Sequence, residues 1–118
     1  MKKQKQLMGC LLSVIVLSSC STTRALYDWK GYDHASFVYT KSSTEESLSN
    51  LLNIYATLTD HPKGLREVPA PGICADYGYL LIMKGEVEKG RDLIIMETKL
   101  YPESKIFLDR ILKRFENR

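Results

Sequence analysis

An apolar run that ends at a cysteine limits how this chain can fold. Residues 7–17 are almost entirely apolar, three lysines precede them within the first five residues, and two serines lead to Cys20. A charged start, a short apolar stretch and small residues are typical of a secretory signal. A membrane-spanning helix needs about 20 apolar residues, and this run is shorter. We therefore expect residues 1–19 to be removed as a signal peptide, which leaves residues 20–118 to form the folded protein.

The last four residues of this segment specify the kind of signal. Leu17-Ser18-Ser19-Cys20 resembles the lipobox that lipoprotein signal peptidase reads, so we expect Cys20 to carry the lipid. An uncleaved membrane helix and a plain secretory signal are the alternatives. The stretch Ser21-Thr22-Thr23 contains no acidic residue, which by resemblance to known sorting rules favours the periplasmic face of the outer membrane over the inner membrane.

Removal of the signal changes the charge of the chain. Three of the 17 basic residues lie in the signal, which leaves 14 basic residues against 14 acidic ones. A nearly neutral chain favours neither nucleic-acid binding nor a polybasic membrane patch. Cys74 would then be the single free thiol, so no internal disulfide is expected, and a small buried core residue is its simplest interpretation.

The apolar pattern beyond the signal is helical. After a tether over residues 20–26, one domain over residues 27–118 is expected, with no strand alternation and about four to five helices. The expected helices span residues 33–40 and 45–59, then a stretch ending at Lys84-Gly85, one closing at Tyr101-Pro102, and residues 103–117. This pattern predicts an all-α fold.

Two sequence features in the first half of the domain predict a helix start and a connector. Ser42 and Ser43 precede Glu45 and Glu46 at the spacing of a capping box, in which a hydroxyl and a carboxylate bond free amides at a helix start. Residues 63–72 contain two prolines and two glycines, which predicts an extended, exposed connector.

Part of the second half fits the tetratricopeptide pattern of large and small residues over 34 positions. The match is Cys74-x2-Tyr77-Gly78-x2-Leu81, then Gly90-x3-Ile94, then Pro102. Gly78 and Gly90 would lie where two helices approach most closely, Gly85 would end the first helix, and Pro102 would stop the second. A generic helical hairpin explains the same residues nearly as well.

Most of residues 27–112 resembles a family of small bacterial lipoproteins of uncharacterised function. The resemblance is carried by Tyr27-x-Trp29-x-Gly31-Tyr32, Pro71-Gly72-Ile73-x-Ala75-x-Tyr77-Gly78-Tyr79-Leu80-Leu81, Lys84-Gly85 and Tyr101-Pro102-Glu103-Ser104. It implies a tetratricopeptide-like domain facing the periplasm. It also implies other envelope lipoproteins as partners, one of them similar to the curli-secretion channel subunit, and brings no catalytic residues. No cofactor is expected.

The residues favour a binding role over catalysis. No nucleophile elbow or phosphate-binding glycine loop is present, and the two histidines lack metal-ligand spacing, so neither a catalytic nor a metal site is expected. We expect an adaptor that acts by protein–protein contact; a peptidoglycan- or small-ligand-binding lipoprotein is the alternative. The partner-contacting candidates are the aromatic residues Tyr27, Trp29, Tyr32 and Tyr79, although aromatic clusters in small domains more often pack in the core.

Overall fold

The computed structural model describes residues 1–6 and 23–116, and Cys20 lies outside the described residues. Residues 2–6 form a short helical segment. The domain contains the helices α2 (Tyr32–Ser42), α3 (Glu45–Asp60), α4 (Ile73–Met83), α5 (Val87–Leu100) and α6 (Lys105–Glu116), with a short 3-10 helix, η1 (Pro102–Ser104), before α6. The predicted all-α class is confirmed. Within the described ranges, no helix is long and apolar enough to span a bilayer.

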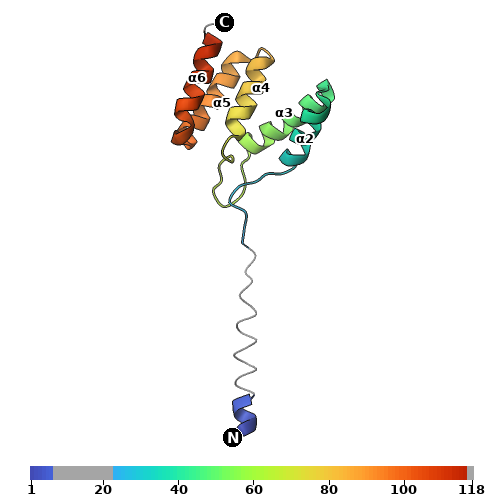
Figure 1. The fold of residues 1–118 in the computed structure, drawn as a ribbon, viewed down its shortest axis with the longest axis vertical. Helices are drawn as coiled ribbons and strands as arrows, with labels where there is room; N and C mark the ends of the chain where they lie inside the picture. Colours follow the sequence, from blue (N-terminus) through green and yellow to red (C-terminus); the bar gives the residue numbers. More distant parts are fainter. Residues whose placement is uncertain (7–22, 117–118) are drawn as a thin grey trace.

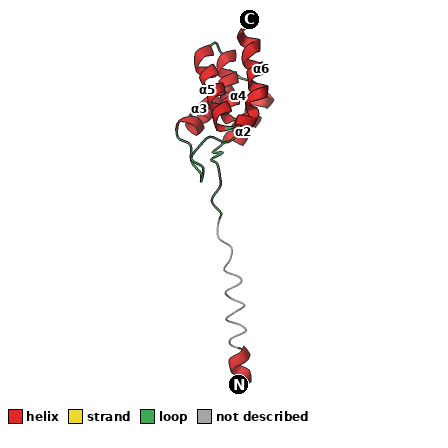
Figure 2. Ribbon diagram, turned by 90° about the vertical axis from the view of Figure 1, so that its left-hand side faces the viewer, coloured by secondary structure: helices red, strands yellow, loops and turns green. Residues whose placement is uncertain are grey.

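The helices pack as successive neighbours in the chain. α2 and α3 form one pair, α4 and α5 form an antiparallel hairpin in the middle, and α6 lies beyond α5 (Figure 1). The loop between α3 and α4 and the segment that leads into α2 extend from the same end of the helical domain, as the view turned by 90° also shows (Figure 2). Each helix therefore contacts mainly those that precede and follow it.

Two glycines allow α4 and α5 to approach backbone to backbone. A Cβ atom placed on Gly78 would stand 2.5 Å from the carbonyl oxygen of Gly90, and one placed on Gly90 would stand 2.6 Å from Cγ1 of Ile82. All six residues that fit the helical-repeat pattern before Pro102 are buried in this hairpin. Gly85 follows α4 with a φ of 94°, a conformation that is easy only for glycine.

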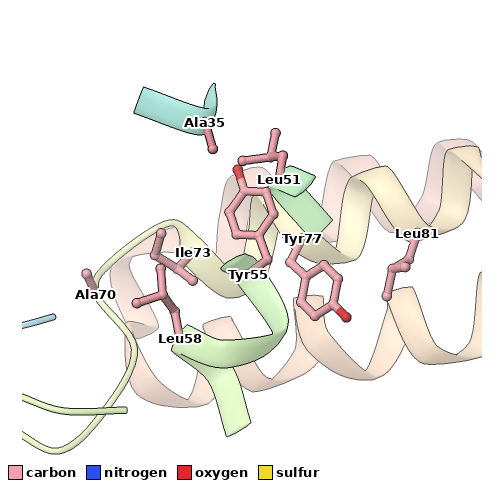
Figure 3. Packing of buried hydrophobic residues seen from close by; sticks show 8 residues of the cluster. All are labelled: Ala35, Leu51, Tyr55, Leu58, Ala70, Ile73, Tyr77 and Leu81. Atoms are coloured by element: carbon pink, nitrogen blue, oxygen red, sulfur yellow. The ribbon is translucent and has the colours of Figure 1, made fainter. Parts of the chain in front are cut away.

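The core consists of two clusters. The larger one joins α3 to α4 through Leu51, Tyr55, Leu58, Ile73 and Tyr77, and Figure 3 shows these side chains converging between the helices. The Tyr55 and Tyr77 rings are stacked, with centroids 5.6 Å apart. The smaller cluster joins the central hairpin to α6 through three side chains, Ile82, Ile94 and Leu108.

The start of α3 differs from the sequence prediction. The capping box is formed by Thr44 and Ser47: the Thr44 hydroxyl accepts from the Ser47 amide at 3.2 Å, and the Ser47 hydroxyl accepts from the Thr44 amide at 3.0 Å. Ser42 is the last residue of α2, and Ser43 adopts a left-handed conformation with φ 46° after it. The predicted serines therefore end one helix, and the cap of the next begins one residue later.

The connector before α4 is only partly exposed. Residues 63–67 are exposed, whereas Pro69 and Ala70 are buried. The Tyr101 hydroxyl at the end of α5 donates to the Pro69 carbonyl at 2.6 Å, and the Glu97 carboxylate accepts from the Gly72 amide at 2.7 Å. The prediction of an extended, exposed connector was wrong for Pro69 and Ala70, because bonds from the end of α5 hold this part of the connector and sequence spacing does not reveal them.

Candidate functional site

An apolar groove of about 480 Å³ lies between α4 and α6. We call it the arginine groove, and its lining residues are Tyr79, Met83, Phe107, Arg110, Ile111, Arg114 and Phe115. Several of its apolar side chains are accessible: Tyr79 is 44 % exposed, Met83 58 % and Phe107 66 %. Exposed apolar side chains that line a groove together are typical of an interaction site.

Two of the cations on α6 have no acidic partner in the described part of the chain. Lys105 pairs with Asp109 at 2.9 Å, and Glu116 pairs with Arg91 of α5 at 3.0 Å. These pairs use the acidic side chains of α6 and leave Arg110 and Arg114 without a counter-charge among the described residues. The two arginines are four residues apart, so they follow the same side of the helix along the groove.

A second groove, of about 230 Å³, continues the surface on the other side of α4. We call it the tyrosine groove, and its lining residues are Tyr32, Ser36, Tyr39, Thr40, Leu51, Tyr55, Asp76, Tyr79 and Leu80. Burial raises the pKa of Tyr55, and the negative charge of Asp76 adds to that effect. The Tyr55 hydroxyl therefore stays protonated and can serve as a hydrogen-bonding group.

Tyr79 lines both grooves and connects them. Its ring lies against Phe115 of α6, with centroids 5.9 Å apart. Helices α2, α4 and α6 therefore contribute to one surface, with tyrosines and an aspartate at one end and apolar residues and arginines at the other. Such a surface can bind an extended or helical segment by combining apolar contacts with charge.

The four predicted contact residues occupy different environments. Tyr79 lies in both grooves, and Tyr32 lies in the tyrosine groove but also packs against the core. Trp29 is 46 % exposed and touches Tyr32, with ring centroids 5.8 Å apart. Tyr27 is partly buried, and its hydroxyl accepts from Nη1 of Arg66 at 3.1 Å. The structure thus brings Tyr32 and Tyr79 to one surface and places Tyr27 and Trp29 outside it.

Cys74 and Glu97 form a buried polar site between α4 and α5. Cys74 is fully buried, and burial raises the pKa of its thiol to about 12, which disfavours the reactive thiolate. Glu97 is 2 % exposed, and burial raises the pKa of its carboxyl group although backbone amides at the start of α4 oppose this shift. Its Oε2 atom has no hydrogen-bond partner among the described residues. The arrangement caps α4, and neither group is accessible to a substrate.

The sequence prediction missed the half of the site on α6. In that helix, Phe107 and its neighbour Ile106 are 66 % and 72 % exposed. Among the described residues of α6, only Leu108 is buried. The signal was present in the spacing: Phe107, Ile111 and Phe115 recur every four residues, and two arginines accompany them.

Comparison with known families assigns the chain to one of them. The family described as "Domain of unknown function (DUF4810)" matches residues 26–111, so the chain belongs to that family. This agrees with the resemblance to an uncharacterised family. No curated protein and no solved structure matches the chain.

Proposed function

We propose that this DUF4810 protein is a lipid-anchored adaptor or assembly factor of the bacterial envelope, and that it binds a segment of a partner lipoprotein in the arginine groove. The main observation that supports this proposal is the composition of the arginine groove. Tyr79, Met83 and Phe107 offer accessible apolar surface, and Arg110 and Arg114 follow its length without an acidic partner among the described residues. A partner segment that carries both apolar and acidic side chains would satisfy both features.

The helical arrangement supports this role. The close approach at Gly78 and Gly90, the turn at Gly85 and the stop at Pro102 agree with a tetratricopeptide-like hairpin. Stacked helical hairpins bind peptides or neighbouring subunits on the surface formed by successive helices. The arginine groove and the tyrosine groove together occupy such a position across α2, α4 and α6.

The proposed location rests on the sequence. Cys20 would carry the lipid after cleavage, and the residues after it would direct the protein to the periplasmic face of the outer membrane. The partners would be other envelope lipoproteins, including a subunit similar to the curli-secretion channel. Replacing Cys20 with Ala should leave the domain folded and release it from membranes; retention of that variant in the membrane fraction would contradict the anchor.

The groove is tested by charge reversal. The lipidated protein and its Arg110→Glu/Arg114→Glu variant are crosslinked gently in cells, purified, and compared by quantitative mass spectrometry. Lys99→Glu on α5 is the matched control, because it reverses an exposed cation that does not line the groove. We expect an envelope lipoprotein to be lost from the double variant alone. Equal recovery with all three proteins would contradict binding in this groove.

Binding of a small ligand is the second candidate function, and the volume of the arginine groove supports it. About 480 Å³ lies in the range of pockets that hold small molecules, roughly 300–1,000 Å³. The groove is bordered by exposed side chains of α6, which suits a long segment better than an enclosed molecule. Recovery of the protein with wall fragments or an organic ligand, and without a partner protein, would favour this candidate.

A further inference from the structure

Two segments far apart in the sequence are joined at the end of the domain where the chain enters it. The Leu65 amide donates to the Ala25 carbonyl at 3.1 Å, and the Arg66 amide donates to the Leu26 carbonyl at 3.1 Å. A Cβ atom on Gly64 would stand 2.7 Å from the Leu26 carbonyl oxygen, so the two backbones are in direct contact. Figures 1 and 2 show residues 23–28 and the loop before α4 at this same end.

This end presents apolar side chains to solvent. Leu26 is 57 % exposed, Leu65 56 % and Trp29 46 %, although backbone bonds fix the segments that carry the two leucines. We call these three side chains, together with Arg24 and Lys63, the basal surface. Exposed tryptophan and aliphatic side chains are suited to the boundary between lipid headgroups and acyl chains.

Cations border the apolar side chains. A hollow of about 400 Å³ is lined by residues of both segments, among them Arg24, Lys63, Leu65 and Asp28. The Asp28 carboxylate accepts from the Lys30 backbone amide at 3.0 Å. Neither Arg24 nor Lys63 forms an ion pair within the described ranges. The basal surface therefore combines aliphatic and indole groups with cations that can meet lipid phosphates.

We infer that the basal surface rests on the lipid bilayer that holds the N-terminus, with Leu26, Trp29 and Leu65 at the headgroup–acyl boundary. This inference rests on the proposed lipidation of Cys20. Leu26 lies six positions after Cys20 in the sequence, and a fully extended chain over six residues spans at most about 21 Å. The anchor therefore keeps the basal surface beside the membrane, and contact there would hold the domain in one orientation instead of letting it swing on its tether.

Trp29 is the single tryptophan of the chain, so its fluorescence can report contact between the basal surface and lipid. The lipidated protein is reconstituted into vesicles of phosphatidylethanolamine and phosphatidylglycerol whose acyl chains are brominated either near the headgroup or near the terminal methyl. Flotation of the vesicles measures anchoring, and quenching of Trp29 fluorescence measures contact with lipid. Quenching is the appropriate readout, since the Tyr32 ring beside Trp29 also affects its emission wavelength.

We expect strong quenching by the shallow bromines and weaker quenching by the deep ones. The Leu26→Ser/Leu65→Ser variant should float equally well but lose most of the quenching. Ile106→Ser is the control, since it removes an even more exposed apolar side chain from α6, outside the basal surface, and should leave quenching unchanged.

The experiment distinguishes failure of the basal-surface inference from failure of the lipid anchor. A protein that floats without quenching would overturn the basal surface and leave the anchor intact. A protein that is shielded from both lipid bromines and aqueous acrylamide would have a protein occupant there, which also overturns the inference. If the wild type does not float, the anchor fails and this inference fails with it, whereas the groove test above remains unaffected.

Discussion

Gly78 of α4 lies directly against the backbone of Gly90 in α5. A methyl group on Gly78 would stand 2.5 Å from the Gly90 carbonyl oxygen and 2.9 Å from Cγ1 of Ile94. The first of these atoms belongs to a helix backbone, which cannot move aside without separating the two helices. The central hairpin therefore depends on the absence of side chains at this point.

Replacing Gly78 with Ala should lower the free energy of unfolding by about 1–3 kcal/mol, the usual cost of overpacking. This loss should occur although alanine is intrinsically better than glycine in a helix by about 1 kcal/mol. Urea unfolding followed by circular dichroism measures the change. Asn53→Ala, at an exposed position of α3, is the control and should change stability by less than about 0.5 kcal/mol. A Gly78→Ala protein as stable as the wild type would contradict the close approach.

The sequence predicts the helices well because their signals are local. The turn at Lys84-Gly85 and the stop at Tyr101-Pro102 depend on residues that end helices wherever they occur. The anchoring of the connector could not be predicted in the same way. The bond from Tyr101 to Pro69 joins residues 32 positions apart, and nothing in either local sequence identifies its partner.

Tyr101→Phe should loosen the connector. The substitution removes the hydroxyl that donates to the Pro69 carbonyl and leaves that buried acceptor unpaired, at a cost of about 1–2 kcal/mol. Limited digestion with trypsin should then cleave faster after Lys63 and Arg66, which lie in the exposed part of the connector. Tyr79→Phe, which changes an exposed hydroxyl, is the control. Equal cleavage rates in the two variants would show that the bond does not restrain the connector.

Glu97 should make stability depend on pH. Burial raises the pKa of its carboxyl group in the folded state, so the folded protein holds this proton more tightly than the unfolded chain does. Its contribution to stability is complete below the unfolded pKa and is lost as the pH rises through the folded pKa. As the pH rises above the usual glutamate pKa of roughly 4, the wild type should therefore lose stability relative to Glu97→Gln, whose amide does not titrate.

Urea unfolding at several pH values measures this difference. Glutamine keeps a carbonyl oxygen for the Gly72 amide, so the comparison isolates the ionisation from the cap. A stability difference that stays constant with pH, or that shifts in favour of the wild type as the pH rises, would show that the folded-state pKa is not raised.

Truncation of two adjacent side chains of α6 should change the stability of the protein to very different extents. Leu108 is 3 % exposed and packs against Ile82 and Ile94, so Leu108→Ala should cost about 2–5 kcal/mol. Phe107 is 66 % exposed, so Phe107→Ala should change stability by less than about 0.5 kcal/mol. Thermal or urea unfolding of the two variants measures both values. A large loss for Phe107→Ala would mean that its ring supports the fold and is not free for a partner.

The candidate site was only half predictable for a related reason. Aromatic residues such as Tyr79 stand out in a sequence, whereas Arg110 and Arg114 resemble an ordinary solvated helix face. Whether these arginines are available to a partner depends on which cations the acidic residues of α6 pair with. Asp109 pairs with Lys105, and Glu116 pairs with Arg91 of α5. The second pair depends on how α6 packs on α5, which the spacing of residues along one helix does not determine.

Site-specific photocrosslinking in cells tests the adaptor role most directly. A photoreactive amino acid is placed at Phe107 in the arginine groove, and at Ile95 of α5 as a control outside it. We predict a discrete adduct with another envelope lipoprotein at Phe107, absent at Ile95 and abolished by Arg110→Glu/Arg114→Glu. No adduct at Phe107, or equal adducts at both positions, would contradict the proposal that this protein holds its partner in the groove.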